Sequence, residues 1–411
     1  MPSRIVGSSL CLIGILAADG ATGNAGSETY RIPAEVFAGE PRGPHPTGTF
    51  EELWVDTSRD ESTTSDPADK RHLMVQIWYP ATDAPGAARA RYVLHRELYP
   101  HDAQSRWLDD VAAVRATSML RAPVARSGGR FPVLIYNPGS GYPPFSGTFQ
   151  TEFLASHGYV VVGIGRGDIS RIERFSDGAR YAADVGTTFF QDMHAEVPFD
   201  VDRLHELAAK HAQTTLRTHV QDIRYVLDRL RALDENRDSR FHGRLDLQRV
   251  GSLGWSFGGA LSLQASRDEP RIKAAVNLDG WLYTDVPETG TLRPVLQMHG
   301  VAPPMDRVPT PVEHEVELAA HALTWKLYAR SRADWYDFVI QRAEHGNFSD
   351  LVLFEPADVR LIHPRLAHEI VNRVTLEFFD KYLRGVGPTP ILSGELTYPD
   401  VKLVKSERVV Q

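Results

Sequence analysis

The middle of the chain contains the hexapeptide Gly254-Trp255-Ser256-Phe257-Gly258-Gly259. This hexapeptide has the G-x-S-x-G form, in which a serine occupies a sharp turn from a strand into a helix. Glycine on either side of the serine suits such a turn, because a side chain there would crowd the backbone. Residues 247–253 before it have a strand pattern, and residues 260–265 after it begin a helical one. We therefore predict a strand–turn–helix unit with Ser256 at its tip; the alternative is a glycine-rich turn without chemistry.

Apolar runs and helical patterns alternate on both sides of this unit. The continuous apolar runs at 131–136 and 159–164 are typical of strands that are buried on both faces of a sheet. A helical pattern at 149–156 separates them, and the order strand, helix, strand implies a right-handed parallel crossover. Further strands are expected at 50–57, 73–79, 272–278, 294–298 and 336–341, and further helices at 218–233, 313–328 and 370–383. The pattern predicts an α/β fold with a mostly parallel sheet flanked by helices.

One large domain, over residues 50–390, contains all of these elements. An irregular lead-in at 26–49 precedes it, and a tail at 391–411 follows it. Residues 165–215 interrupt the alternation with many charges and several glycines, so we expect an insertion there that covers an edge of the sheet. The pair Phe189-Phe190 in this insertion is a weak indication of contact with a lipid surface.

Composition limits the class of partner. The chain has 411 residues, of which 42% are apolar, and this is enough for a large core. Its formal net charge at pH 7 is −8. A nucleic-acid partner requires a basic patch, and an acidic chain gives no support for one. We therefore expect no nucleic-acid partner.

The first residues have the pattern of a secretory signal peptide. Arg4 supplies a positive charge, residues 5–18 are mostly apolar, and Gly23-Asn24-Ala25 offers small residues for cleavage. The apolar run is about 14 residues long, whereas a membrane-spanning helix needs roughly 20. We expect a cleaved signal at 1–25 rather than a membrane anchor. The mature chain would then be secreted or periplasmic, with no transmembrane span.

Cys11 is the single cysteine of the sequence, and it lies inside this leader. A mature chain would therefore contain no cysteine, which excludes disulfides, thiol catalysis and cysteine metal sites from it. Residues 8–10 do not resemble a lipoprotein cleavage box, so lipidation of Cys11 is the less favoured alternative.

A serine nucleophile needs a base, usually histidine, and a carboxylate that holds the histidine in one tautomer. His345 directly follows the last expected strand, and functional loops gather at the carboxyl ends of parallel strands. We therefore predict that His345 is the base; the alternative is a histidine in an ordinary surface loop. His299 also ends a strand, but it precedes the last one, and we expect a structural role for it.

Two aspartates compete for the role of the carboxylate. Asp279 directly follows the first strand after the hexapeptide, and Asp306 follows the next strand. The second position is the more usual one in folds that order the triad as serine, acid and histidine. Asp306, however, lies eight residues beyond Met298 and across two prolines. Spacing alone favours Asp279 only slightly, and both residues remain open.

An acyl-transfer site also needs two backbone N–H groups for the oxygen that becomes negative in the reaction. Phe257, the residue after the serine, supplies the first one. The second should come from the loop after the early buried strand, Asn137-Pro138-Gly139-Ser140-Gly141. Because Pro138 has no N–H, Gly139 or Ser140 must donate; the alternative is an ordinary strand exit.

Four stretches together resemble the plasma-type platelet-activating factor acetylhydrolases, a family of secreted serine phospholipases. The hexapeptide differs from the family's Gly-His-Ser-Phe-Gly-Gly at Trp255. The family's acid motif, Leu-Asp-x-Trp, is similar to Leu278-Asp279-Gly280-Trp281, and its histidine motif, His-x-Asn-Phe-x-Asp, to His345-Gly346-Asn347-Phe348-Ser349-Asp350. Its early strand resembles Val75-Gln76-Ile77-Trp78-Tyr79-Pro80. The resemblance covers roughly residues 50–385.

The resemblance implies an α/β-hydrolase fold that uses no metal ion and no other cofactor. It implies that Asp279 is the acid and that Ser140 and Phe257 form the oxyanion hole. The matching loop of the family begins with His-Gly, and this chain departs from that pattern at Asn137-Pro138. The resemblance also implies an ester substrate with a short or oxidised acyl chain at the sn-2 position of a phospholipid.

We therefore expect a secreted serine esterase in which Ser256, Asp279 and His345 form a catalytic triad and act through an acyl-enzyme. Its substrates would be phospholipids like platelet-activating factor, or related small esters, and it could contact a lipid surface. Trp281 and Trp255 are expected to line the substrate pocket.

Three other functions stay open. The form Gly-Trp-Ser-x-Gly-Gly is similar to the elbow of prolyl-oligopeptidase-type peptidases, but only about 100 residues of mature chain precede Phe131, without a propeller-like repeat. A polyester- or cutin-type esterase would use the same residues. A non-catalytic binding protein of this fold would usually lack a triad member, and here all three are present.

Overall fold

The computed structural model describes the chain except residues 1–30, 39–41, 62–63, 65, 67, 85, 181–205, 207–209, 211, 283, 304–310 and 407–411. The expected signal peptide, Phe189-Phe190 and Asp306 lie outside the described residues. Among the described residues, no helix combines the length and the apolar character that crossing a membrane requires.

An 11-stranded sheet runs through the described part of the molecule, in the order β11-β10-β9-β8-β7-β5-β6-β2-β1-β4-β3. Its strands are β1 (Thr47–Asp60), β2 (Lys70–Pro80), β3 (Arg89–Arg91), β4 (Arg115–Leu120), β5 (Phe131–Asn137), β6 (Val160–Arg166), β7 (Leu245–Trp255), β8 (Ile272–Leu278), β9 (Val295–Val301), β10 (Trp335–Gln341) and β11 (Val401–Ser406). The six central strands from β6 to β10 are parallel, whereas β2 and β11 run antiparallel to their neighbours. The expected mostly parallel sheet is therefore confirmed.

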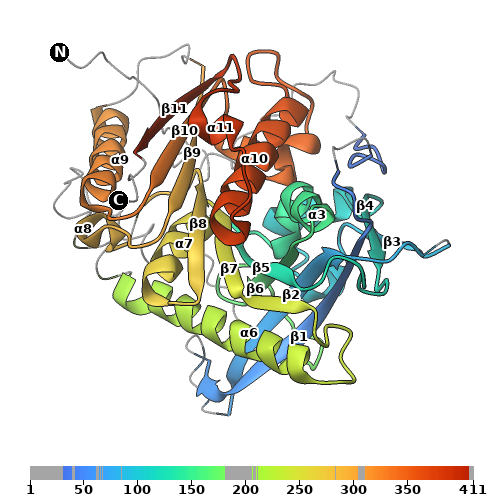
Figure 1. Ribbon diagram of the computed structural model, residues 1–411. Helices are drawn as coiled ribbons and strands as arrows, with labels where there is room; N and C mark the ends of the chain where they lie inside the picture. Colours follow the sequence, from blue (N-terminus) through green and yellow to red (C-terminus); the bar gives the residue numbers. More distant parts are fainter. Residues whose placement is uncertain are drawn as a thin grey trace.

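Helices cover both faces of this sheet (Figure 1). They are α2 (Trp107–Asp110), α3 (Thr148–Ser156), α6 (Arg217–Glu235), α7 (Phe257–Asp268), α8 (Val286–Thr289), α9 (Pro311–Arg330), α10 (Pro364–Phe379) and α11 (Pro390–Ser393). One core cluster packs α3 and α10 against the sheet, and a second packs α6, α7 and α9 against the opposite face.

Strand β5 shows why its sequence is a continuous apolar run. Leu134 and Tyr136 point into the first core cluster, and Val133 and Ile135 point into the second. Side chains alternate between the two faces of a strand, so a strand that is covered on both faces needs apolar residues at every position. The two-layer cover of helices thus follows from the composition of the central strands.

Two strands, β4 and β11, depart from the sequence-based expectation. No strand was expected between residues 79 and 131, but β4 forms there, next to the single helical turn α2. The C-terminal segment was expected to be a tail, but β11 pairs with β10 and extends the sheet. These are edge strands or strands near an edge, and they lack the long apolar runs that mark the centre of the sheet.

Candidate active site

Ser256 lies at the turn between β7 and α7, as the hexapeptide predicted. Its backbone has φ 56° and ψ −125°, a conformation that residues with a side chain rarely adopt. The neighbouring glycines make the turn possible. A Cβ atom on Gly258 would lie 1.9 Å from the backbone oxygen of Asn137, and a Cβ on Gly254 would lie 2.3 Å from the backbone of Gly258.

His345 and Asp279 meet beside this turn. Asp279 follows β8, and His345 begins a short 3-10 helix (His345–Phe348) after β10. The Nδ1 atom of His345 lies 2.7 Å from Oδ2 of Asp279, and the backbone N–H of Gly300 donates to Oδ1 at 3.0 Å. A carboxylate bound in this way holds the proton on Nδ1 and leaves Nε2 as the basic nitrogen.

The charge of Asp279 is stabilised although its side chain is only 11% exposed. Burial works to raise its pKa, but the hydrogen bond and charge of His345 outweigh burial, with further help from His299 and the amide of Gly300. The pKa of Asp279 therefore lies below its usual value, and the group stays ionised at neutral pH.

His299 lies at the end of β9 and pairs with Asp337 on β10, with 3.1 Å between Nε2 and Oδ1. Burial lowers its pKa, but the carboxylates of Asp337 and Asp279 raise the value above the ordinary one. The charge of His299 in turn helps to lower the pKa of Asp279. Of the two candidate acids, Asp279 is described by the structure, whereas Asp306 lies outside the described residues.

The loop after β5 runs next to the serine. A Cβ atom on Gly139 would lie 3.3 Å from the Cβ of Ser256, so the backbone that precedes Ser140 approaches the serine side chain closely. Ser140 is half-buried in this loop. Phe257 is the first residue of α7, and the N–H groups of a first helical turn point outward from the amino end of the helix. The two predicted donors therefore lie on segments that flank Ser256.

The two tryptophans expected in the substrate pocket have different surroundings. Trp281 is half-buried and packs against the core cluster beneath α6 and α7. Trp255 is only 2% exposed, and its indole contacts the loop of His345 and the backbone of Gly139.

Asp350 is the last residue of the motif that begins with His345, and no role was predicted for it from the sequence. Its carboxylate accepts hydrogen bonds from the backbone N–H groups of Thr148 at 2.7 Å and Phe149 at 2.9 Å, and from the hydroxyl of Tyr92 at 3.1 Å. Asp350 thereby ties the loop of His345 to the amino end of α3. An aspartate five residues after the predicted base was the only available signal.

A buried ion cluster lies behind the loop after β5. Asp222 on α6 is fully buried among three guanidinium groups, with Arg71 at 2.8 Å, Arg166 at 2.9 Å and Arg59 at 2.9 Å. Arg71 and Arg166 hold the pKa of Asp222 far below its usual value, although burial alone would raise it. Arg166 also donates to the side-chain oxygen of Asn137 at 3.3 Å, so the cluster reaches the residue from which the loop starts.

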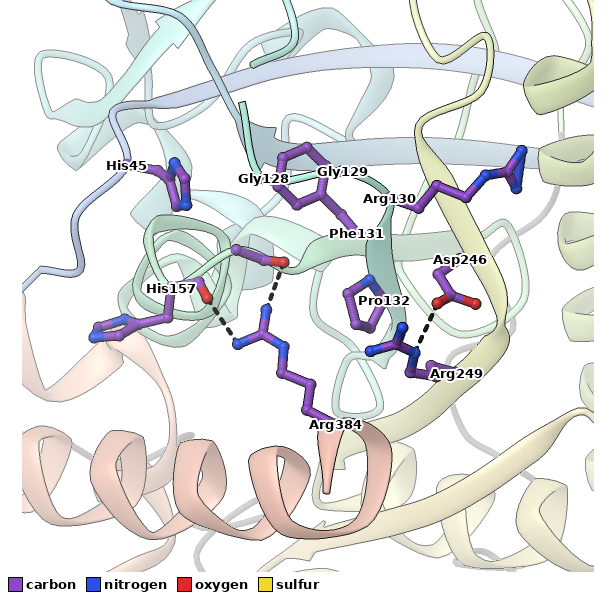
Figure 2. A pocket seen from close by; sticks show the side chains of 11 residues that line it. His45, Gly128, Gly129, Arg130, Phe131, Pro132, His157, Asp246, Arg249 and Arg384 are labelled. Carbon is purple, nitrogen blue, oxygen red and sulfur yellow. Dashed lines mark hydrogen bonds and ion pairs between the residues drawn. The ribbon is translucent and has the colours of Figure 1, made fainter. Parts of the chain in front are cut away.

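A cavity of about 550 Å³ opens near the amino ends of β5 and β7 (Figure 2). Ser256 lies at the other end of these strands, after the carboxyl end of β7. The three arginines of the cavity each pair with an aspartate: Arg130 with Asp234, Arg249 with Asp246, and Arg384 with Asp380. The charge of this cavity is therefore largely neutralised. Among the described residues, no cluster of three or more histidine, cysteine or acidic side chains could hold a metal ion.

Comparison with known proteins agrees with this geometry. A family model described as PET hydrolase-like (PETase) matches residues 208–310. Platelet-activating factor acetylhydrolase of Canis lupus familiaris is 26% identical over 174 residues, 38% of this chain and 36% of that protein. The Bos taurus protein of the same name is 24% identical over 174 residues, 38% of this chain and 37% of that protein. The chain thus matches little more than a third of the length of these relatives.

A solved structure shares the fold. Ferulic acid esterase from Streptomyces cinnamoneus aligns with a TM-score of 0.63 at 24% sequence identity, over 89% of this chain and 98% of that chain. The sheet, the elbow and this likeness define an α/β-hydrolase fold. Within that class the chain is similar to platelet-activating factor acetylhydrolases and to PET hydrolase-like proteins, and these matches support a carboxylic ester hydrolase at the level of the family.

Proposed function

We propose that this chain is a serine carboxylic-ester hydrolase that works through an acyl-enzyme. The observation that carries the proposal is the 2.7 Å contact between Nδ1 of His345 and Oδ2 of Asp279, beside a serine whose φ is 56°. Serine, histidine and aspartate arranged at neighbouring strand ends are the parts of a nucleophilic acyl-transfer site.

In this mechanism the Oγ of Ser256 attacks the carbonyl carbon of an ester, and Nε2 of His345 takes the serine proton. The same nitrogen then gives that proton to the leaving alcohol. Asp279 holds the imidazole and stabilises its charged form. The backbone N–H groups of Phe257 and Ser140 donate to the oxyanion of the tetrahedral intermediate. Water, activated by His345, then hydrolyses the acyl-enzyme and frees Ser256.

The proposed substrates are esters with short or oxidised acyl chains, such as phospholipids similar to platelet-activating factor. The motif resemblance and the two acetylhydrolase matches support this choice. Action on polyesters or other small esters is the second candidate, because the PET hydrolase-like model matches the segment that contains both Ser256 and Asp279. We also propose secretion, on the leader pattern of residues 1–25.

Hydrolysis of p-nitrophenyl esters from acetate to long acyl chains tests the reaction and the substrate class together. Ser256→Ala should reduce turnover to a trace, and Ser393→Ala, an exposed serine on α11, should leave it unchanged. A sharp preference for the shortest chains would support the acetylhydrolase assignment. A rate that rises with chain length would favour a lipase-like groove, and normal turnover in Ser256→Ala would refute the mechanism.

A further inference from the structure

The indole of Trp255 lies against the loop that carries the predicted base. Its Nε1 donates a hydrogen bond to the backbone oxygen of His345 at 3.0 Å. Its ring also packs against the imidazole, with 4.9 Å between ring centroids and 38° between ring planes. Trp255 therefore contacts both the main chain and the side chain of His345.

The same indole touches the loop on the other side of the serine. A Cβ atom on Gly139 would lie 2.8 Å from Cε3 of Trp255, so the glycine backbone packs directly on the ring. The ring of Tyr142, further along this loop, lies 5.0 Å from the ring of Trp255. Because Trp255 directly precedes Ser256, one side chain joins the serine turn, the histidine loop and the loop after β5.

We propose that Trp255 is a positioning residue that fixes His345 and the Gly139 loop relative to Ser256. The proposal rests on the proposed esterase function. Asp279 contacts the imidazole at Nδ1, and a rotation of the ring about this contact would displace Nε2. The indole adds a second point of attachment at the His345 backbone and a flat surface against the imidazole. Trp255 is 2% exposed, so it acts through these neighbours rather than through the substrate.

Trp255→Phe removes the indole N–H and keeps an aromatic ring. We expect kcat to fall roughly 10- to 100-fold, because small misplacements of a catalytic group reduce rates by about this much. KM should change by less than about twofold, since the buried side chain contributes no binding surface. In the proton NMR spectrum, the low-field signal of the His345 Nδ1–H should broaden or disappear.

Trp54→Phe is the matched control. Trp54 lies on β1, is 4% exposed, and donates one hydrogen bond, to Glu52 at 3.4 Å. This variant should lose a similar amount of thermal stability and keep both kcat and the low-field signal. If Trp255→Phe does not fold, Trp255→Tyr takes its place, since it also removes the indole N–H and keeps an aromatic ring, and the same fall in kcat and the same change of the low-field signal are expected.

The outcomes separate this proposal from the proposed function. An unchanged kcat with an unchanged low-field signal in Trp255→Phe would overturn the positioning role, and a raised KM at unchanged kcat would show a substrate contact instead. If Ser256→Ala stays active, the esterase mechanism fails. The low-field signal still reports on the His345–Asp279 contact in that case, so the positioning claim is tested independently.

Discussion

The carboxylate of Asp279 is held at both of its oxygens, by the imidazole of His345 at 2.7 Å and by the amide of Gly300 at 3.0 Å. This double attachment fixes the plane of the carboxylate and hence the orientation of the ring that it binds. The sequence indicated these residues because each one follows an apolar strand. The spacing of the sequence patterns locates the ends of strands but not the direction of a side chain. It therefore could not decide whether Asp279 or Asp306 is the acid. It also could not show that the indole of Trp255 packs against the loop of His345.

At this scale we predict the effect of Asp279→Asn. The amide keeps the size of the side chain but favours the wrong tautomer of His345, and kcat should fall by about 10⁴. Steady-state kinetics on p-nitrophenyl acetate measures the loss, and circular dichroism checks that the fold is retained. Asp306→Asn is the comparison variant and should change kcat little. The assignment fails if Asp306→Asn is the crippled enzyme.

The strand–turn–helix unit shows how closely the elements pack around Ser256. Glycine is required at 258 because the carbonyl oxygen of Asn137, at the end of β5, occupies the place where a Cβ would lie. The sequence predicted this unit and the central strands well, since strands covered on both faces leave an unbroken apolar signal. It missed β4 and β11. The sequence of β11 mixes lysine with apolar residues, and the strand has a single neighbour in the sheet.

Gly258→Ala tests how closely the backbone packs at the serine turn. The clash is with backbone atoms, which cannot rotate away, so the serine turn must shift. We expect a loss of about 1–3 kcal/mol in the free energy of unfolding, and loss of most esterase activity. Gly387→Ala is the control, because a Cβ there would meet no atom within 4 Å. Urea unfolding compares the two; equal stability of both variants would contradict the packing that we describe.

Across the whole molecule, the buried cluster of Asp222 with Arg71 and Arg166 joins α6, β2 and β6 behind the site. No apolar pattern in the sequence indicates such a cluster, because its members are charged residues on three separate elements. Arg71 and Asp222 are 151 residues apart in the sequence, and only the fold brings them together. The outline of the fold can thus be predicted from the sequence, whereas its buried polar contacts cannot.

Asp222→Asn should leave three guanidinium groups, those of Arg59, Arg71 and Arg166, without their shared carboxylate. We expect the free energy of unfolding at pH 7 to fall by about 3–5 kcal/mol. The pKa of Asp222 is lower in the folded chain than its ordinary value of 3.8, so its stabilising effect is present above that pH and is lost as the pH falls further. The difference between wild type and variant should therefore shrink below about pH 3.8.

Urea unfolding at a series of pH values measures this effect. Asp228→Asn provides the control, because Asp228 lies on the same helix and its side chain is 62% exposed. That variant should change stability by less than about 1 kcal/mol at every pH. If the difference in the free energy of unfolding between wild type and Asp222→Asn stays constant as the pH falls below 3.8, the cluster does not contribute to stability through charge.

The central claim is that Ser256 is a nucleophile activated by His345. Covalent labelling with a fluorophosphonate, followed by mass spectrometry of the digested protein, tests this claim most directly. We predict one label per chain, located on Ser256, absent from Ser256→Ala and formed far more slowly in His345→Ala. A folded wild-type protein that takes no label, or that carries it on another residue, would contradict the account.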